Sequence, residues 1–162
     1  MAILDPSEVL FTAFEPKVAN RFIMYIDGIP SYFIYKVSGP GFDAGEIIVD
    51  HINVYRKTKG KIKWDDMTLE LYDAITPSAQ QSVMEWARLA HESVTGRDGY
   101  SDFYKKDLKL ELIGPPGDIV GEWVIKGAFV KTAKFGDYAW DGGDQKVILN
   151  LTIAMDYCIL NF

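Results

Sequence analysis

Apolar and polar residues alternate along most of this chain, which is the pattern of β-strands rather than of helices. Phe22, Met24 and Ile26 share one side of a predicted strand over 20–27, and a second strand is expected over 32–38. Further strands are predicted over 108–112, 120–126, 128–135 and 146–157. Apolar residues on both sides of the first two strands indicate that both faces are covered, either by another layer or by another subunit.

The stretch over 46–72 predicts a long β-hairpin. Two extended arms rich in Ile, Val and aromatic residues meet at Lys57-Thr58-Lys59-Gly60, which we interpret as the turn. In the descending arm the apolar positions change parity at Asp65-Asp66, so a bulge or bend is expected there. We expect the part after the bend to lie in the core and the part before it to extend outward.

One helix is predicted, over 77–95. Thr76 followed by Pro77 offers one N-terminal cap, and Ser78 with Gln81 offers a competing capping box. Gly96 is typical of a C-terminal cap. Apolar residues recur at helical spacing at Val83, Trp86, Ala87, Ala90 and Val94.

Together these elements predict one domain over 1–162 that is mainly β. The expected architecture is an antiparallel β-sandwich or barrel with one flanking α-helix and a long extended hairpin. A chain of 162 residues can bury roughly 70% of its unfolded surface in one core. The segment 1–19, broken by Pro6 and Pro16, is expected to be an arm that docks either on its own domain or on a neighbour.

Charge is distributed unevenly along the chain. The sequence has 17 basic and 23 acidic residues, a formal net charge of -6, which argues against tight, sequence-specific binding of nucleic acid. It is compatible with a surface over which nucleic acid slides. Five of the eight residues over 56–63 are nevertheless basic: Arg56, Lys57, Lys59, Lys61 and Lys63.

Candidate chemistry is sparse. The two histidines, His51 and His91, have no second ligand at metal-binding spacing, and the single Cys158 is expected to be a buried small apolar residue. We therefore expect no metal site, no cofactor and no enzymatic activity; a hydrolase that uses Asp65 or Asp66 is the weakest alternative. The sequence shows neither a signal peptide nor a membrane span, so synthesis in the cytoplasm is expected.

The basic segment and its apolar flanks favour self-assembly. Lysines on an edge hairpin can simply prevent aggregation, but an isolated two-stranded ribbon is not stable in water and needs a partner. A heterologous contact with an acidic patch of the next copy would build rings or filaments. The residues predicted to contact a neighbouring subunit are Arg56, Lys57, Lys59, Lys61, Lys63, Ile52, Val54, Tyr55, Ile62, Asp137, Asp141 and Asp144.

Over nearly its whole length the chain resembles the tail tube proteins of contractile-tailed bacteriophages. The resemblance is carried by the strand that begins Asn20-Arg21-Phe22, the hairpin with its basic segment, and the run Trp64-Asp65-Asp66-Met67-Thr68-Leu69-Glu70-Leu71-Tyr72-Asp73. The helix with Trp86 and the late Trp140-Asp141 and Met155-Asp156-Tyr157 complete it. The chain departs from the pattern at its end, where residues 158–162 run on past Tyr157.

The resemblance implies a ring-forming tube subunit of the virion tail. Six-membered rings would stack into a tube inside a contractile sheath, with one continuous inner β-barrel around a channel. The implied partners are further copies of the chain, the sheath protein, the tape-measure protein and baseplate or tail-terminator proteins, with DNA only in transit. Two alternatives stay open: the inner tube of a bacterial contractile injection machine, and a monomeric β-barrel that binds a small ligand in a concave pocket.

Overall fold

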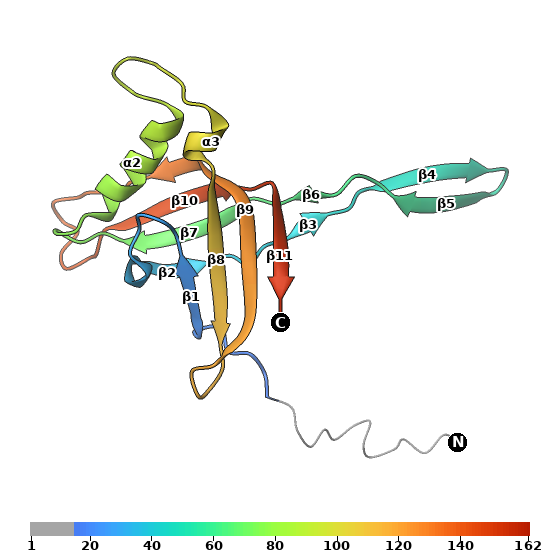
Figure 1. The fold of residues 1–162 in the computed structure, drawn as a ribbon, viewed down its shortest axis with the longest axis horizontal. Coiled ribbons are helices and arrows are strands. Elements are labelled where there is room, and N and C mark those ends of the chain that lie inside the picture. The colour runs from blue at the N-terminus through green and yellow to red at the C-terminus, as the bar shows by residue number, and fades with distance from the viewer. Residues whose placement is uncertain (1–14) are drawn as a thin grey trace.

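A computed structural model describes residues 15–162 of the protein (Figure 1). Most of the expected N-terminal arm, residues 1–14, lies outside the described residues. The strands are β1 (Phe22–Tyr25), β2 (Ile34–Val37), β3 (Phe42–Asp43), β4 (Glu46–His51), β5 (Val54–Lys59), β6 (Lys63–Trp64), β7 (Met67–Tyr72), β8 (Lys106–Ile113), β9 (Ile119–Lys134), β10 (Ile148–Ala154) and β11 (Tyr157–Asn161). The helices are the 3-10 turn η1 (Ser31–Phe33), α2 (Ala79–Ala90) and α3 (Ser101–Tyr104).

Two antiparallel sheets share the long strand β9. Its first half pairs with β8 and β11, and β8 pairs in turn with β1; we call these strands the first sheet. Its second half pairs with β10, followed by β7 and β2, which form the second sheet. The sequence pattern predicted two strands over 120–135, whereas the structure has one strand that passes from one sheet to the other at Gly127.

A corner at Gly127 explains why the chain turns at Asp156 near its C-terminal end. Gly127 has a positive φ of 66°, and a Cβ there would overlap the carboxylate of Asp156. The Asp156 N–H donates to the Lys126 carbonyl at 3.0 Å, and Lys105 Nζ lies 2.9 Å from the Asp156 carboxylate. The predicted single strand over 146–157 is therefore wrong: the chain turns at Asp156, and the last residues form β11 in the first sheet.

The core lies between the sheets and under α2. Alternate residues of β7 and β10 point into it, as the strand pattern predicted, and they are joined there by side chains from β1, β8, β9 and α2. Buried members include Met24, Met67, Leu69, Leu71, Val83, Trp86, Leu108, Ile125, Leu149, Leu151 and Ile153. The indole N–H of Trp86 donates to the Tyr104 carbonyl at 2.7 Å, so its one polar group is satisfied.

The helix is shorter than predicted. It begins after Ser78, whose hydroxyl accepts from the Gln81 N–H at 3.4 Å, so the second of the two predicted caps is the one formed. It ends at Ala90 because the chain folds back: Gly99 N–H donates to the Ala90 carbonyl, and His91 Nδ1 lies 2.7 Å from Asp98 Oδ1. Val94 consequently lies outside the helix.

The second sheet continues outward as a hairpin (Figure 1). After β2 the chain runs through β3 into β4, and after β5 it returns through β6 into β7, with β3 paired to β6 and β4 to β5. The predicted break at Asp65-Asp66 is confirmed, since these residues separate β6 from the buried strand β7. The predicted mainly β, antiparallel fold with one main helix and an extended hairpin is confirmed.

Candidate assembly surface

The β4–β5 hairpin projects away from the rest of the molecule (Figure 1). All twelve residues of its two strands are exposed. Ile52 at the tip has a relative exposure of 101%, and five other exposed apolar residues follow along the two strands: Ile47, Ile48, Val49, Val54 and Tyr55. Exposed apolar side chains gathered on one projecting ribbon are typical of an interaction site.

The turn of the hairpin is not where the sequence predicted it. The register pairs His51 with Val54, so the two-residue turn is Ile52-Asn53, and Asn is a common turn residue. Gly60 instead lies at the base, where its N–H faces the Gly45 carbonyl at 3.4 Å. A Cβ at Gly60 would lie 3.2 Å from the Ala44 carbonyl oxygen, so glycine here serves the close approach of two chain segments.

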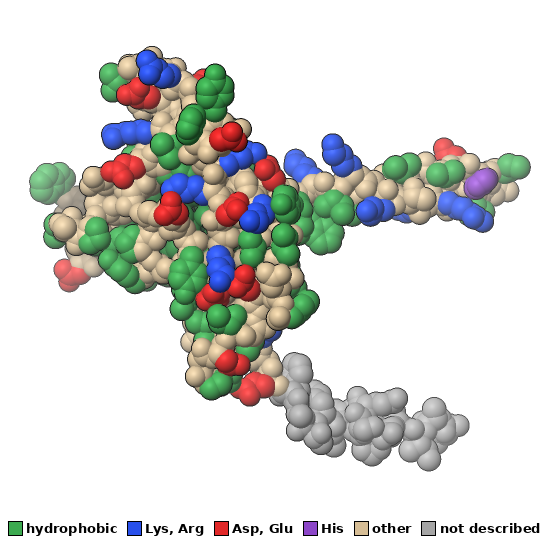
Figure 2. All heavy atoms as spheres, viewed as in Figure 1, with side chains coloured by type: hydrophobic (Ala, Val, Ile, Leu, Met, Phe, Trp, Pro, Cys, Tyr) green, Lys and Arg blue, Asp and Glu red, His purple; other side chains and the backbone are tan. Residues whose placement is uncertain are grey.

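The predicted basic tip is therefore wrong. Arg56, Lys57 and Lys59 lie along β5, while Lys61 and Lys63 lie at the base of the hairpin. Figure 2 shows the same distribution, with basic side chains spread along the ribbon and its base. Lys57 Nζ lies 2.8 Å from the Glu46 carboxylate across the ladder, which partly neutralises the charge within the ribbon.

The register gives the ribbon two different faces, because alternate residues of a strand point to opposite sides. One face, which we call the apolar face, carries Ile47, Val49 and Val54 together with His51, Arg56 and Thr58. The opposite face, the charged face, carries Glu46, Asp50, Lys57 and Lys59 together with Ile48 and Tyr55. The apolar face is the one that a protein partner would bury at least cost.

A groove of about 700 Å³ lies at the base of the hairpin. Ile62 and Trp64 line one side of it, and Met155 and Asp156 at the β10–β11 corner line the other. Trp64 packs against Phe42 of the paired strand, with ring centroids 5.3 Å apart. The groove places the predicted contact residues Ile62, Lys61 and Lys63 together, beside the point where the ribbon leaves the domain.

The predicted acidic contact residues lie at the other end of the molecule. Asp137, Asp141 and Asp144 are in the loop between β9 and β10, on the left in Figure 1, opposite the hairpin. The same loop exposes two large aromatic residues, Tyr138 and Trp140, the latter with a relative exposure of 108%. Sequence reasoning placed Trp140 in this loop but did not predict that the loop presents aromatic and acidic side chains together.

Several of the remaining ionisable groups of residues 15–162 form ion pairs. Lys109 bridges Glu111 and Glu122 at 2.8 and 2.9 Å, and its hydrogen bond lowers the pKa of Glu122. Asp66, one of the two candidate hydrolase residues, is paired with Lys131 Nζ at 2.6 Å. Cys158 is half-buried, less than the sequence predicted, and this desolvation raises the pKa of its thiol to about 11.

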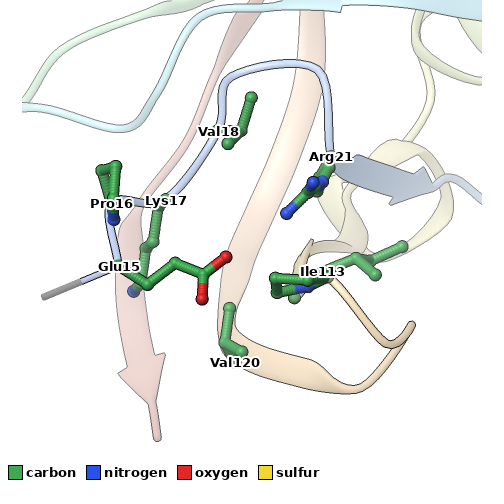
Figure 3. Close-up of a pocket in the computed structure, with 9 residues that line it drawn as sticks. Glu15, Pro16, Lys17, Val18, Arg21, Ile113 and Val120 are labelled. Carbon is green, nitrogen blue, oxygen red and sulfur yellow. The ribbon is translucent and has the colours of Figure 1, made fainter. Parts of the chain in front are cut away.

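Residues 15–162 form no metal site. Among them no group of three His, Cys, Asp or Glu residues is arranged to hold a metal ion, and no helix is long and apolar enough to cross a membrane. A cavity of about 190 Å³ lies where the described chain begins, between Glu15, Val18, Arg21 and the β8–β9 turn (Figure 3). It is below the 300–1,000 Å³ of usual ligand pockets, and charged side chains point across its mouth.

Comparison with known proteins identifies the fold. No family model and no curated protein match the sequence. A chain of the PVC sheath-tube complex of an extracellular contractile injection system, in the extended state, matches with a TM-score of 0.70 and 19% identity over 90% of this chain and 91% of that one. A chain of the anti-feeding prophage cap (the AFP tube terminating cap) matches with a TM-score of 0.74 and 17% identity over 93% and 94%.

A more distant likeness in fold is found to Hcp1. Hcp1 from Flavobacterium johnsoniae matches with a TM-score of 0.50 and 13% identity over 87% of this chain and 94% of that one. At these identities the likeness concerns the fold, and it confirms the predicted resemblance at that level: the chain has the fold of contractile tail tubes.

Proposed function

We propose that this protein is a structural subunit of the inner tube of a contractile machine. Copies of the chain form six-membered rings, and the rings stack into a tube that lies inside a contractile sheath. The observation that supports this most is the β4–β5 hairpin, whose strand residues are all exposed on a domain with the tube fold.

The hairpin needs a partner for physical reasons. A two-stranded ribbon without a covered face is marginal in water, and this one leaves the domain without packing on it. Each apolar side chain that becomes fully buried contributes about 1.5–3 kcal/mol. Burial of Ile47, Val49 and Val54 on a neighbouring subunit would therefore stabilise both the ribbon and the assembly.

A second copy of the chain is the partner that fits best. The hairpin and its base carry the cluster of five basic residues, and the loop at the opposite end carries Asp137, Asp141 and Asp144 with two exposed aromatic residues. Complementary surfaces at opposite ends of one subunit make a heterologous contact, which closes into rings or continues as a stack. In this proposal the apolar face packs on the neighbour and the lysines face its acidic loop.

The contractile machine can be of two kinds. The sequence resembles phage tail tubes, in which the subunit would belong to the virion tail, with tape-measure protein and DNA passing in transit. A solved structure of the same fold comes from an extracellular contractile injection system. Either setting adds a sheath and baseplate or terminator proteins as partners, and genes for capsid and terminase beside this gene would assign it to a phage.

The proposal is tested by two matched substitutions in neighbouring hairpin residues. Val49→Glu places a carboxylate on the apolar face opposite Arg56, and Ile48→Glu places one on the charged face opposite Lys57. Each new carboxylate has a basic residue opposite it in the ladder, so the two substitutions should affect the pairing of the hairpin strands equally. Negative-stain microscopy should show rings or tubes for the wild type and for Ile48→Glu, and single subunits for Val49→Glu. Normal assembly of Val49→Glu would overturn the proposed role of the hairpin.

A further inference from the structure

The two sheets present outer faces of different chemistry. Among the described strands, those of the first sheet expose four large apolar side chains: Tyr25, Ile119, Tyr157 and Ile159. The strands of the second sheet expose one, Tyr35. Since both faces point away from the shared core, the difference bears on what each face meets outside the subunit.

Hydroxyl groups form a row across the outer face of the second sheet. The register places Thr132 beside Thr152 and Thr152 beside Thr68. Ser38 extends the row at the edge, where its hydroxyl accepts from the Thr68 N–H at 2.8 Å. Strands β9, β10 and β7, and the residue that follows β2, are thus crossed by one line of small, uncharged polar side chains.

Three lysines of this face are paired with nearby carboxylates. Lys36 Nζ lies 3.2 Å from Glu70, Lys131 Nζ lies 2.6 Å from Asp66, and Lys134 Nζ lies 3.2 Å from Asp137. Where a cation has a carboxylate beside it, the surface attracts neither anionic nor cationic molecules strongly.

The aromatic residues of this face are also shielded. Tyr35 and Tyr72 stack with ring centroids 4.6 Å apart, and Lys146 Nζ lies 4.7 Å from the centroid of Tyr72. The Tyr35 hydroxyl donates to Glu70. The two rings therefore present a charged and hydroxylated surface to solvent instead of an open apolar one.

The outer face of the first sheet differs in the way that an interface does. One cross-strand row reads Tyr25, Lys109, Val124 and Ile159, and Lys126 pairs across the ladder with Tyr157. In Figure 2 hydrophobic, acidic and basic side chains alternate over β1, β8, β9 and β11. Mixed apolar and paired charged groups are compatible with contact to another protein, whereas a hydroxyl row gains little from being buried.

We infer that the outer face of the second sheet is the wall of the channel in the assembled tube. This inference rests on the proposed function, because a channel exists only if the subunits form rings. The wall then consists of the threonine row with self-neutralised ion pairs on both sides of it, a surface that stays wet and over which a polymer of either charge moves without binding. The hairpin extends β2 and β7 of this same sheet, so the proposed subunit contact directly adjoins the proposed channel wall.

Cysteine labelling of assembled tubes tests the inference. In a Cys158→Ala background, Thr152→Cys places a thiol on the proposed wall and Ile159→Cys places one on the outer face of the first sheet. Tubes are collected by sedimentation and treated with a small maleimide, or with the same maleimide on a globular carrier protein wider than the channel. Thr152→Cys should react with the small reagent only, while free subunits of the same variant should react with both.

The outcomes separate this inference from the proposed function. Tubes in which Thr152→Cys reacts with both reagents would place the face on the outside, and tubes in which it reacts with neither would place it between subunits; either result overturns the inference alone. The same reagent-size pattern at Ile159→Cys, without it at Thr152→Cys, would assign the wall to the first sheet. If the Cys158→Ala protein and the wild type both fail to assemble, this result contradicts the proposed function and therefore also the inference about the channel wall.

Discussion

Strand β7 and the β4–β5 hairpin are close in the chain and each has a face with several apolar residues, yet their environments are opposite. In β7, Met67, Leu69 and Leu71 are buried in the core of their own domain. In the hairpin, Ile47, Val49 and Val54 share one face of the ribbon and remain exposed. An apolar strand face therefore indicates that it will be covered, but it does not reveal whether the cover comes from the same chain or from another copy.

The largest expected difference between β7 and the hairpin is in how much each loses in stability when side-chain volume is removed at one site. Leu69→Ala should lower the free energy of unfolding by about 2–5 kcal/mol, because it leaves a cavity in a packed core. Val49→Ala in the hairpin should change the free energy of unfolding of the unassembled subunit by less than about 0.5 kcal/mol. Urea unfolding followed by circular dichroism measures both, and a similar loss in the two variants would show that the hairpin packs on its own domain.

Charge reversal along the basic segment should have an intermediate effect. Changing Lys57, Lys59 and Lys61 together to Glu removes the proposed attraction to the acidic loop of the next copy and the pair of Lys57 with Glu46. We expect fewer and shorter tubes by electron microscopy, with an unchanged circular dichroism spectrum. Since these groups are exposed, the wild-type tubes should also shorten as salt is raised.

If the triple variant gives tubes of wild-type length with wild-type salt resistance, the lysines serve only to keep the edge of the hairpin soluble. The Val49→Glu and Ile48→Glu pair would then still report on the apolar face, since neither substitution touches a lysine.

The smallest expected effect concerns the ion-pair network on the first sheet. Lys109 is held between Glu111 and Glu122; its pKa is raised by both carboxylates, and that of Glu122 is lowered. A lowered carboxyl pKa stabilises the fold above the ordinary value of 4.5 and loses this effect as pH falls through the folded-state value. Lys109→Met should therefore lower the urea midpoint at pH 7, and the difference from wild type should shrink toward pH 3.

Ile23→Val on the same face provides a control without a charge change, because Ile23 lies beside Glu111 in the register. A Lys109→Met midpoint that differs from wild type equally at pH 7 and pH 3 would show that the lysine acts through packing of its aliphatic stem instead of its charge.

Much of the domain could be predicted from the sequence because its strands have one buried face. The alternation of Phe22, Met24 and Ile26 and the parity change at Asp65-Asp66 both correspond to real features. The break at Asp156 could not be predicted, since it depends on Gly127 and Lys105, which meet Asp156 only in the folded chain. Local patterns carry no information on such distant contacts.

The position of the hairpin turn was missed for a different reason. Lys59-Gly60 looks like a turn, whereas Ile52-Asn53, with one strongly apolar residue, does not. A monomer gains nothing from an isoleucine at an exposed tip, so this choice becomes understandable only if the tip meets another subunit. The predicted contact residues stay predictions, but the register now divides the hairpin into an apolar face and a charged face.

The central claim, that the exposed hairpin is covered by another copy of the chain, is tested most directly by the mass of the wild-type protein in solution. Light scattering over increasing concentration, combined with negative-stain microscopy of the same samples, should show a shift from single subunits of 18.3 kDa to rings and tubes of constant diameter. A species that remains at the subunit mass at the highest concentration, with and without added sheath and baseplate components, would contradict it.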